Sequence, residues 1–280
     1  MKKLFPLFLA LSLTLALAAC GGDTNDSSAE GTDGTAAEPV DLYVFAAASL
    51  EESLNEVIDL YKEAAPDVTV VATYDSSGTL KTQIQEGADC DVFLSAAPKQ
   101  MNQLDAEGGA ENTEGLDLVD HSTRLDLLEN KVTLAVPEGN PKGIASFDQL
   151  SELLQNGDVF LAMGNSDVPV GQYTQKIFDY YGLDESAIAS CLTYGSNVKE
   201  VTTQVSEGAV DCGVIYQTDA FSAKLTVVDT ATAEMCGQVV YPAAVMNVSQ
   251  HPQQAQDFLA YLTSDDGDAV FEGVGFTPMG

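Results

Sequence analysis

Five short segments of the chain place small, neutral hydrogen-bond donors where a helix is expected to begin. They are residues 46–50, 76–80, 167–171, 195–198 and 213–216. None of them contains Lys or Arg. A helix start carries free backbone N–H groups and the positive end of the helix dipole, so it suits an anion. Several such starts converging on one cleft could hold an oxyanion with hydroxyl and amide donors alone, and the segments therefore predict a binding site.

The charge of the chain excludes several classes of function. The sequence has 43 acidic and 11 basic residues, a formal net charge of −32, and Arg124 as its single arginine. Nucleic-acid binding and attachment to anionic lipid through basic patches both need clustered Lys and Arg, so neither is expected. The acidity indicates a solubilising surface, and it repels dissolved anions at long range. Any anion site must therefore attract its ligand through local donors.

The N-terminus is typical of an exported lipoprotein. An apolar run over residues 4–19 follows a charged start, and the segment Leu17-Ala18-Ala19-Cys20-Gly21 resembles a bacterial lipoprotein cleavage box. We expect a signal peptide over residues 1–19 and lipidation of Cys20, which would anchor the protein outside the cytoplasm to the cell membrane. A retained membrane helix is the alternative, but the run is short for a span. Residues 20–39 are polar and acidic, and they predict a flexible linker.

The other cysteines leave two alternatives open. They are even in number in an exported chain, so structural disulfides and buried free thiols are both possible, and sequence alone cannot choose a pairing. Their wide spacing argues against a zinc knot or a redox motif. The four are Cys90, Cys191, Cys212 and Cys236.

Strands and helices are expected to alternate along the chain. Ser49 and Glu52 fit a capping box, which predicts that a helix begins at Ser49. Pro66 and Gly87 are expected to end helices. The alternation predicts an α/β fold whose mostly parallel sheets are flanked by helices. The expected strands cover residues 41–47, 68–73, 91–96, 131–136, 159–163, 191–194, 212–216, 225–228 and 239–248, and the expected helices 49–64, 79–86, 98–108, 147–156, 173–181, 198–207 and 252–263.

The order of these elements predicts two lobes. We expect lobe one over residues 40–130 and 240–280, and lobe two, including the crossing segments, over residues 131–239. Two lobes joined by more than one crossing segment make a hinged cleft that can close on a ligand. Ligands in open α/β sheets bind beyond the carboxyl ends of strands, and all five donor segments follow expected strands.

These motifs, in this order, resemble the molybdate-binding proteins of ABC importers, which are type II solute-binding proteins. The resemblance extends over residues 41–280. It rests on Val44-Phe45-Ala46-Ala47-Ala48-Ser49-Leu50, Ser76-Ser77-Gly78-Thr79-Leu80 with Gln83-Ile84, Ala88-Asp89-Cys90-Asp91-Val92-Phe93-Leu94-Ser95-Ala96, Val168-Pro169-Val170-Gly171-Gln172-Tyr173, Asn197-Val198, Gly213-Val214-Ile215-Tyr216 with Thr218-Asp219-Ala220, Tyr241-Pro242 and Gly275-Phe276.

The resemblance implies a set of site residues. The family holds its oxyanion with two serine hydroxyls, backbone amides and one tyrosine hydroxyl. Carried over residue by residue, these roles fall on Ser49, Ser77, Val170, Val198 and Tyr216. Several alternatives stay open, because Ser76 is a rival for Ser77, because Ser49 and Asn197 could each be only a helix cap, and because Tyr216 could be a core residue.

The resemblance also implies a function. The protein is expected to capture molybdate, with tungstate as a second ligand, and to deliver the captured anion to a membrane permease. It is expected to act as a monomer and without a cofactor. The metal would be bound as its oxyanion, with no direct protein ligand. Another tetrahedral oxyanion such as sulfate is the alternative ligand. A hydrolytic or adhesive surface lipoprotein is the rival class, but only His121 and His251 could build a His-based catalytic or metal site, and no nucleophile elbow or Walker loop occurs.

Overall fold

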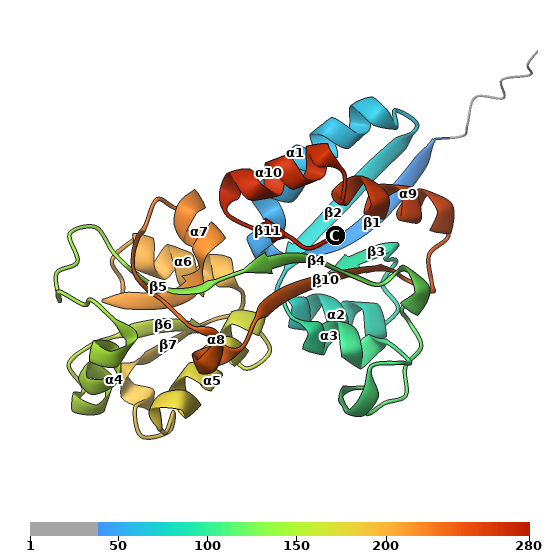
Figure 1. The fold of residues 1–280 in the computed structure, drawn as a ribbon. Coiled ribbons are helices and arrows are strands. Elements are labelled where there is room, and N and C mark those ends of the chain that lie inside the picture. Colours follow the sequence, from blue (N-terminus) through green and yellow to red (C-terminus); the bar gives the residue numbers. More distant parts are fainter. Residues whose placement is uncertain (1–38) are drawn as a thin grey trace, which may run out of the picture. The chain divides into compact units, whose positions relative to one another are not determined.

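The structure is a computed structural model that describes residues 39–280. These residues form two mixed β-sheets flanked by helices (Figure 1). We call the six-stranded sheet with its helices lobe one, and the five-stranded sheet with its helices lobe two. The expected signal peptide, Cys20 and almost all of the expected linker lie outside the described residues.

The sheet of lobe one combines strands from both ends of the described chain. Its strand order is β11-β4-β10-β3-β1-β2. The strands are β1 (Val40–Ala47), β2 (Val68–Asp75), β3 (Val92–Leu94), β4 (Leu125–Asn130), β10 (Val239–Val245) and β11 (Thr277–Pro278).

The sheet of lobe two is built from the middle of the chain, in the order β7-β6-β8-β5-β9. The chain enters it directly from β4 and leaves it after β9. The strands are β5 (Val132–Val136), β6 (Leu161–Gly164), β7 (Leu192–Gly195), β8 (Cys212–Tyr216) and β9 (Thr226–Thr230).

The expected α/β fold is confirmed, but the sheets are mixed rather than mostly parallel. Strand β1 runs parallel to β2 and β3, and β6 runs parallel to β7 and β8. The antiparallel pairs all involve β10 with β3 and β4, β4 with β11, or β5 with β8 and β9. Strands β4, β5, β9 and β10 flank the two passages between the lobes, so the antiparallel pairs arise where the chain crosses and returns.

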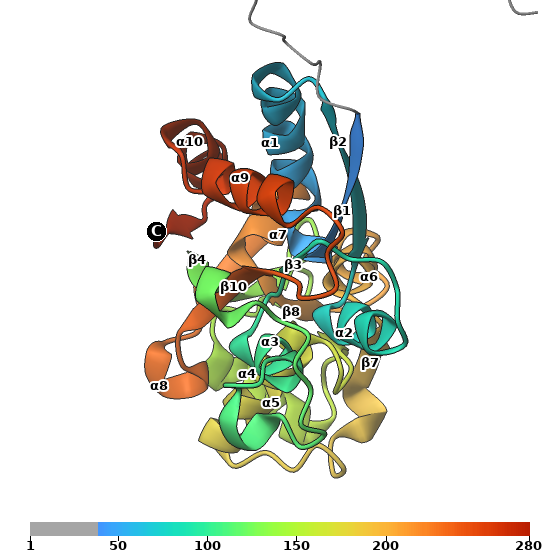
Figure 2. The same ribbon diagram turned by 90° about the vertical axis from the view of Figure 1, so that its right-hand side faces the viewer.

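Helices cover both faces of the sheet of lobe one (Figures 1 and 2). Alternate residues of a strand point to opposite faces of a sheet. In β1, Val44 packs with the core under α1, α9 and α10, and Phe45 packs with the core over α2 and α3. In β3, Val92 and Phe93 divide in the same way. Lobe one therefore has a three-layer architecture.

Helices α1, α2, α5, α6 and α7 are the ones that follow the strands leading to the predicted site residues. The α-helices are α1 (Glu51–Ala64), α2 (Ser77–Gln85), α3 (Pro98–Leu104), α4 (Phe147–Asn156), α5 (Pro169–Tyr181), α6 (Val198–Ser206), α7 (Gln217–Ser222), α8 (Ala233–Cys236), α9 (Pro252–Leu262) and α10 (Asp265–Val274). The 3₁₀ turns are Ala48–Leu50, Gly109–Glu111, His121–Thr123 and Ala189–Cys191.

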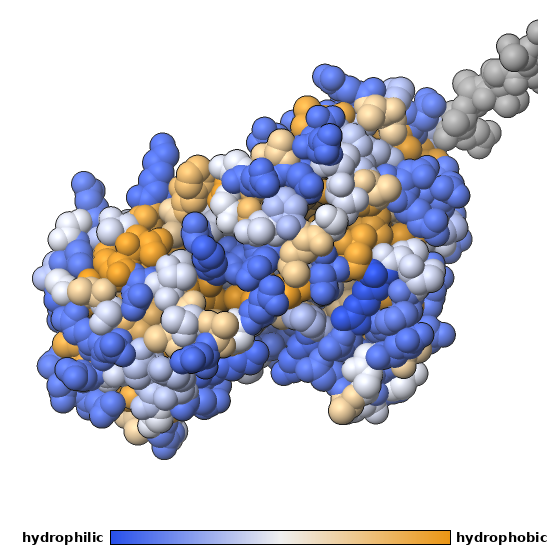
Figure 3. All heavy atoms as spheres, in the orientation of Figure 1, coloured by the Kyte–Doolittle hydropathy of each residue, from blue (hydrophilic) through white to orange (hydrophobic). Residues whose placement is uncertain are grey.

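The face seen in Figure 3 is mostly hydrophilic, as the acidic composition predicts. Within residues 39–280, no helix is long and apolar enough to cross a membrane. The cysteines within these residues are buried free thiols rather than disulfides. The cysteine pairings that the sequence allowed are therefore not formed in this structure.

Candidate functional site

All five residues predicted to bind the ligand line one small cavity between the lobes. They are Ser49, Ser77, Val170, Val198 and Tyr216. Each of them is at most 5 % exposed. The cavity has a volume of about 10 Å³, which is roughly the space that one water-sized sphere needs. The cavity also touches Ala47, Ala48, Asp75, Ser76, Ala96, Val168 and Pro169.

Ser77 and Ser76 have different roles, although they are neighbours. Ser76 is the N-cap of α2, and its hydroxyl oxygen accepts a bond from the Thr79 N–H at 3.1 Å. The hydroxyl oxygen of Ser77 accepts the Ala96 N–H at 2.9 Å, and Ser77 is fully buried. Because the oxygen of Ser77 already accepts a bond, its own proton can be donated into the cavity.

Val170 and Val198 contribute backbone rather than side-chain chemistry. Val170 is the second residue of α5, and Val198 is the first residue of α6 after its N-cap Asn197. The N–H groups at these positions have no acceptor within their own helix. Asn197 caps α6 as expected, because its side-chain oxygen accepts the Glu200 N–H at 3.1 Å. The two helix starts therefore bring the positive ends of two helix dipoles to lobe two's side of the cavity.

Tyr216 is the last residue of β8 and the N-cap of α7. The segment 213–216 is therefore a strand rather than the helix start that its small residues suggested. The hydroxyl of Tyr216 is buried and has no hydrogen-bond partner among the described residues. Burial raises the pKa of Tyr216 well above its ordinary value, so the hydroxyl keeps its proton. An unpartnered buried donor costs about 1–3 kcal/mol, and this hydroxyl is free to donate into the cavity.

Ser49 corrects one prediction, because it does not cap a helix. It lies inside a 3₁₀ turn, and α1 begins two residues later with Leu50 as its N-cap. The predicted capping box between Ser49 and Glu52 is therefore not formed. The hydroxyl of Ser49 instead lies 2.9 Å from the hydroxyl of Tyr241. The side chain of Glu52 instead forms an ion pair with Lys199 of lobe two.

The lobes contact each other next to the cavity. The Asn197 side chain donates a 3.3 Å hydrogen bond to the carboxylate of Asp75. Gly78 in α2 lies against the loop before α5, where a Cβ atom would come within 2.2 Å of the Asp167 carbonyl oxygen. This approach leaves no room for any side chain at Gly78, so the structure has the closed arrangement expected of a hinged cleft.

Several residues near the cavity were missed by the sequence-based predictions. Asp75 lines it, and one of its carboxylate oxygens accepts bonds from the Ser76 N–H and from Asn197. Tyr241 contacts Ser49 from behind. Asp219 is buried without a hydrogen-bond partner for either carboxylate oxygen among the described residues. The motif Thr218-Asp219-Ala220 was noticed in the sequence, but it offered no signal of burial.

The histidines do not build a second reactive centre. His121 lies 2.8 Å from the carboxylate of Asp105, which also accepts a 2.6 Å bond from Arg124. None of these three residues lines the cavity. Within residues 39–280, no three His, Cys, Asp or Glu side chains are grouped so that they could hold a metal ion. The cavity is instead lined by hydroxyl groups and by the first residues of α5 and α6, which can donate hydrogen bonds.

Comparisons with known proteins agree with this geometry. A family described as bacterial extracellular solute-binding protein matches residues 42–277. A Bacillus subtilis protein named "Putative ABC transporter substrate-binding lipoprotein YvgL" is 32 % identical over 279 residues, which cover 99 % of each chain. The molybdate-binding protein ModA of Mycobacterium tuberculosis is 31 % identical over 266 residues, which cover 94 % of each chain.

A solved structure supports the fold. The periplasmic molybdate-binding protein of Azotobacter vinelandii aligns with a TM-score of 0.70 at 21 % identity, covering 84 % of this chain and 98 % of that one. At this level of identity the likeness concerns the fold alone. It confirms the two-lobed architecture of type II solute-binding proteins.

Proposed function

Because this chain belongs to the bacterial extracellular solute-binding protein family, we propose that it captures molybdate or tungstate outside the cytoplasm and delivers it to an ABC permease. The observation that carries this proposal is the unpartnered hydroxyl of Tyr216, buried in the same small cavity as Ser49 and Ser77. The molybdate-binding relatives at about 31 % identity support the choice of ligand.

The donors of the cavity suit a fully ionised dianion. Hydroxyl groups of Ser49 and Ser77 come from lobe one, and the Tyr216 hydroxyl and two helix starts come from lobe two. A dianion offers acceptors and no donor, so neutral donors match all of its oxygens. Each charge-assisted hydrogen bond contributes about 1.5–3 kcal/mol in a water-excluded site. A protonated oxyanion such as hydrogen phosphate brings a donor, and the carboxylate in the lining, Asp75, already accepts from the Ser76 N–H and from Asn197 through one of its oxygens.

The small volume of the cavity also limits the ligand. A cavity of about 10 Å³ is smaller than the pockets of roughly 300–1,000 Å³ that hold drug-sized molecules. A tetrahedral oxyanion fits if the hinge opens slightly, whereas an organic ligand requires a much larger separation of the lobes. We expect capture rather than catalysis, because the cavity lining contains no histidine or cysteine that could act as a base or nucleophile.

Sulfate is the second candidate ligand, because it is also a tetrahedral dianion. Calorimetric titration of the purified protein with molybdate, tungstate, sulfate and phosphate tests the assignment. We expect tight binding of molybdate and tungstate, weaker binding of sulfate and the weakest binding of phosphate. Tightest binding of sulfate would reassign the ligand, and binding of none of the four anions would reject the proposed function.

Delivery to a permease requires the protein to stay near the membrane. We propose that Cys20, outside the described residues, carries the lipid that anchors a monomeric protein to the cell membrane. The name of the Bacillus subtilis relative includes the word lipoprotein, which supports this. Mass spectrometry of the membrane fraction should detect a diacylated or triacylated Cys20 as the first residue. An intact Met1 terminus would contradict the anchor.

A further inference from the structure

A chain of buried polar groups leads away from the cavity behind Ser49. The hydroxyl of Ser49 lies 2.9 Å from that of Tyr241, and the Asn130 side-chain amide donates to Tyr241 at 3.2 Å. The same Asn130 nitrogen donates to the Thr218 hydroxyl at 2.9 Å. The Asn130 side-chain oxygen accepts the Lys131 N–H at 2.8 Å. Ser49, Asn130, Thr218 and Tyr241 are all at most 5 % exposed.

The bonds of Asn130 favour one direction for the protons of this chain. The side-chain oxygen of Asn130 faces a backbone N–H, so its NH₂ group must face Tyr241 and Thr218. An amide NH₂ can only donate, so the Tyr241 oxygen accepts. The 2.9 Å contact between the hydroxyls of Tyr241 and Ser49 allows either of them to donate, and because Tyr241 accepts from Asn130 we infer that it donates its own proton to Ser49. The Ser49 oxygen accepts that proton, so the Ser49 proton remains free to be donated into the cavity.

Tyr241 can fulfil this role because it stays protonated. Burial raises the pKa of Tyr241 well above its ordinary value, and the nearby Asp219 raises it further. The hydrogen bonds with Ser49 and Asn130 act in the opposite direction but are outweighed. A neutral Tyr241 has both the acceptor and the single donor that the chain requires.

We propose that Tyr241 and Asn130 are positioning residues that keep Ser49 a hydrogen-bond donor toward the bound oxyanion. This inference rests on the proposed function and deepens it, because it assigns the source of selectivity for an unprotonated ligand. A serine hydroxyl can rotate and either donate or accept. With its oxygen accepting from Tyr241, Ser49 turns its own proton toward the cavity, so a ligand oxygen that carries a proton faces a donor there.

Ser77 follows the same design with a different partner. Its oxygen accepts the Ala96 N–H at 2.9 Å, so its proton is also directed to the cavity. A backbone N–H cannot change direction, whereas the Ser49 partner is a rotatable hydroxyl that Asn130 must orient. Ser49 is therefore the serine whose donor role depends on other side chains, and it is the one that substitutions can reverse.

We call the hydrogen-bonded chain of Asn130, Tyr241 and Ser49 the relay. It also connects the two passages between the lobes. Asn130 ends β4 immediately before the chain enters β5, and Tyr241 lies in β10 after the chain has returned. Thr218 belongs to α7 of lobe two. Asn130 therefore contacts both Tyr241 of lobe one and Thr218 of lobe two through the same amide nitrogen.

A double-mutant cycle with Tyr241→Phe and Ser49→Ala tests the relay. Affinities for molybdate and phosphate are measured by calorimetry at one pH, and thermal denaturation checks that each variant is folded. We expect Tyr241→Phe to weaken molybdate binding about five- to thirtyfold and to lower the ratio of molybdate to phosphate affinity by about tenfold. In the Ser49→Ala background, Tyr241→Phe should change either affinity by less than about twofold.

The matched control is Tyr61→Phe, which removes the hydroxyl of a buried tyrosine of α1 that has no part in the cavity and should leave the affinity ratio unchanged. If Tyr241→Phe fails to fold, Asn130→Ala replaces it, because it keeps both hydroxyls but removes the group that orders their protons. This variant should lower the affinity ratio in the same direction by a smaller factor.

The outcomes separate the relay from the proposed function. Independent, additive effects of Tyr241→Phe and Ser49→Ala, or an unchanged affinity ratio in Tyr241→Phe, would overturn the relay while leaving oxyanion capture intact. Failure of the wild-type protein to bind any of the tested oxyanions would reject the proposed function, and the relay with it. A reduced ratio that vanishes in the Ser49→Ala background would support both.

Discussion

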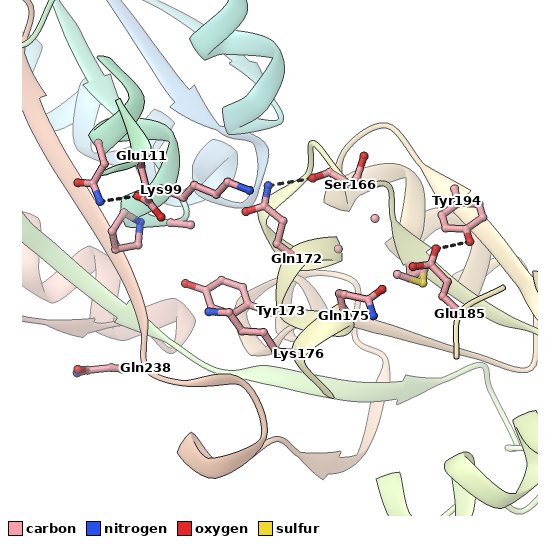
Figure 4. Close-up of a pocket in the computed structure, with 16 residues that line it drawn as sticks. Lys99, Glu111, Ser166, Gln172, Tyr173, Gln175, Lys176, Glu185, Tyr194 and Gln238 are labelled. Carbon is pink, nitrogen blue, oxygen red and sulfur yellow. Dashed lines mark hydrogen bonds between the residues drawn. The ribbon is translucent and has the colours of Figure 1, made fainter. Parts of the chain in front are cut away.

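Among residues 39–280, two of the spaces between the lobes differ in size and in the chemistry of their walls. The larger cleft has a volume of about 550 Å³ and is lined by Lys99 of α3 and Lys176 of α5 (Figure 4). The smaller cavity, of about 10 Å³, contains the buried serines and Tyr216 and no lysine. On size and positive charge alone, the larger cleft would be chosen as an anion site.

The comparison teaches that fixed donors matter more than volume or formal charge. In the larger cleft, Gln172 donates to the Ser166 carbonyl oxygen, and Lys176 lies 5.0 Å from the centre of the Tyr173 ring. Glu111 and Glu185 add negative charge to the walls of the larger cleft, and Asp75 does so in the smaller cavity. In the smaller cavity, the donors are held by helix starts and buried hydrogen bonds, and their desolvation is already complete. We therefore expect a small dianion to bind in the smaller cavity rather than in the larger cleft.

The largest effect on molybdate affinity should come from a substitution at Gly78 that keeps the lobes apart. Gly78→Ala places a Cβ atom within 2.2 Å of the Asp167 carbonyl oxygen of lobe two, so the lobes cannot close fully. We expect molybdate affinity to fall on the order of a hundredfold or more. Calorimetry measures the affinity, and small-angle scattering should show no compaction on addition of ligand. Gly273→Ala, which meets no atom within 4 Å, is the control and should bind as the wild type does.

Removal of the Tyr216 hydroxyl should separate binding from stability. Tyr216→Phe should weaken molybdate binding about tenfold to a few hundredfold, because one buried acceptor oxygen loses its donor. The unliganded protein should not be less stable, because this hydroxyl has no partner in the described structure. Calorimetry and thermal denaturation of the unliganded variant measure the two effects. Wild-type affinity, or a large loss of stability, would remove Tyr216 from the site.

The affinity of the small cavity should also depend on pH through Asp219. The pKa of Asp219 is raised to about 7, mainly by burial. The charge of Lys199 acts to lower this pKa, and the charge of Glu52 acts to raise it. The charge of Asp219 in turn raises the pKa values of Tyr216 and Tyr241, so Asp219 interacts electrostatically with groups at the cavity. A bound dianion favours neutral Asp219, so binding takes up a proton above pH 7. Affinity should fall as pH rises above 7, by up to about tenfold per pH unit.

The raised pKa of Asp219 also makes the free energy of unfolding depend on pH. The folded-state pKa of Asp219, about 7, lies above the ordinary value of 3.8. The folded protein therefore binds more protons between these values, and the free energy of unfolding should decrease as pH rises from about 4 to 7. Asp219→Asn should remove this contribution and also flatten the pH dependence of molybdate affinity above pH 7. Molybdate titrations at pH 6 and pH 8 measure the pH dependence of affinity in the wild type and in Asp219→Asn. The same change of affinity with pH in both proteins would contradict the assignment of this dependence to Asp219.

The smallest effect is expected in the larger cleft. Replacement of Lys99 and Lys176 by Gln removes its lysines but no donor of the small cavity. The equilibrium affinity for molybdate at 150 mM salt should change less than about threefold, because exposed charges are screened. Stopped-flow measurements at low salt should show a slower association. A loss of affinity comparable to that of Tyr216→Phe would move the ligand site to the larger cleft.

Much of the fold could be predicted because strands and helices alternate with clear stop signals. Strands such as β1 and β5 are apolar runs bounded by Ser49 or Pro137, and Gly157 and Gly182 end α4 and α5 in left-handed conformations. The short strand β4 was missed, because its residues 125–130 mix charged and apolar side chains. The antiparallel pairs were missed because pairing across a hinge depends on contacts distant in sequence.

The candidate site could be predicted only in part. Ser77 and Tyr216 were selected through motif order, and the structure adds what no motif shows, namely which hydroxyls already have partners. The capping prediction for Ser49 was wrong, because the 3₁₀ turn moves the helix start to Glu51. Tyr241 lies almost two hundred residues from Ser49, so its role could not be predicted from local pattern.

One measurement tests the central claim most directly: molybdate titration of Ser77→Ala beside Ser76→Ala. Both variants should be less stable, because Ser76 caps α2 and Ser77 accepts the Ala96 N–H. Only Ser77→Ala should lose affinity, by about tenfold to a few hundredfold, and Ser76→Ala should bind within about twofold of the wild type. Equal affinities in the two variants would contradict an oxyanion held by the Ser77 hydroxyl in the small cavity.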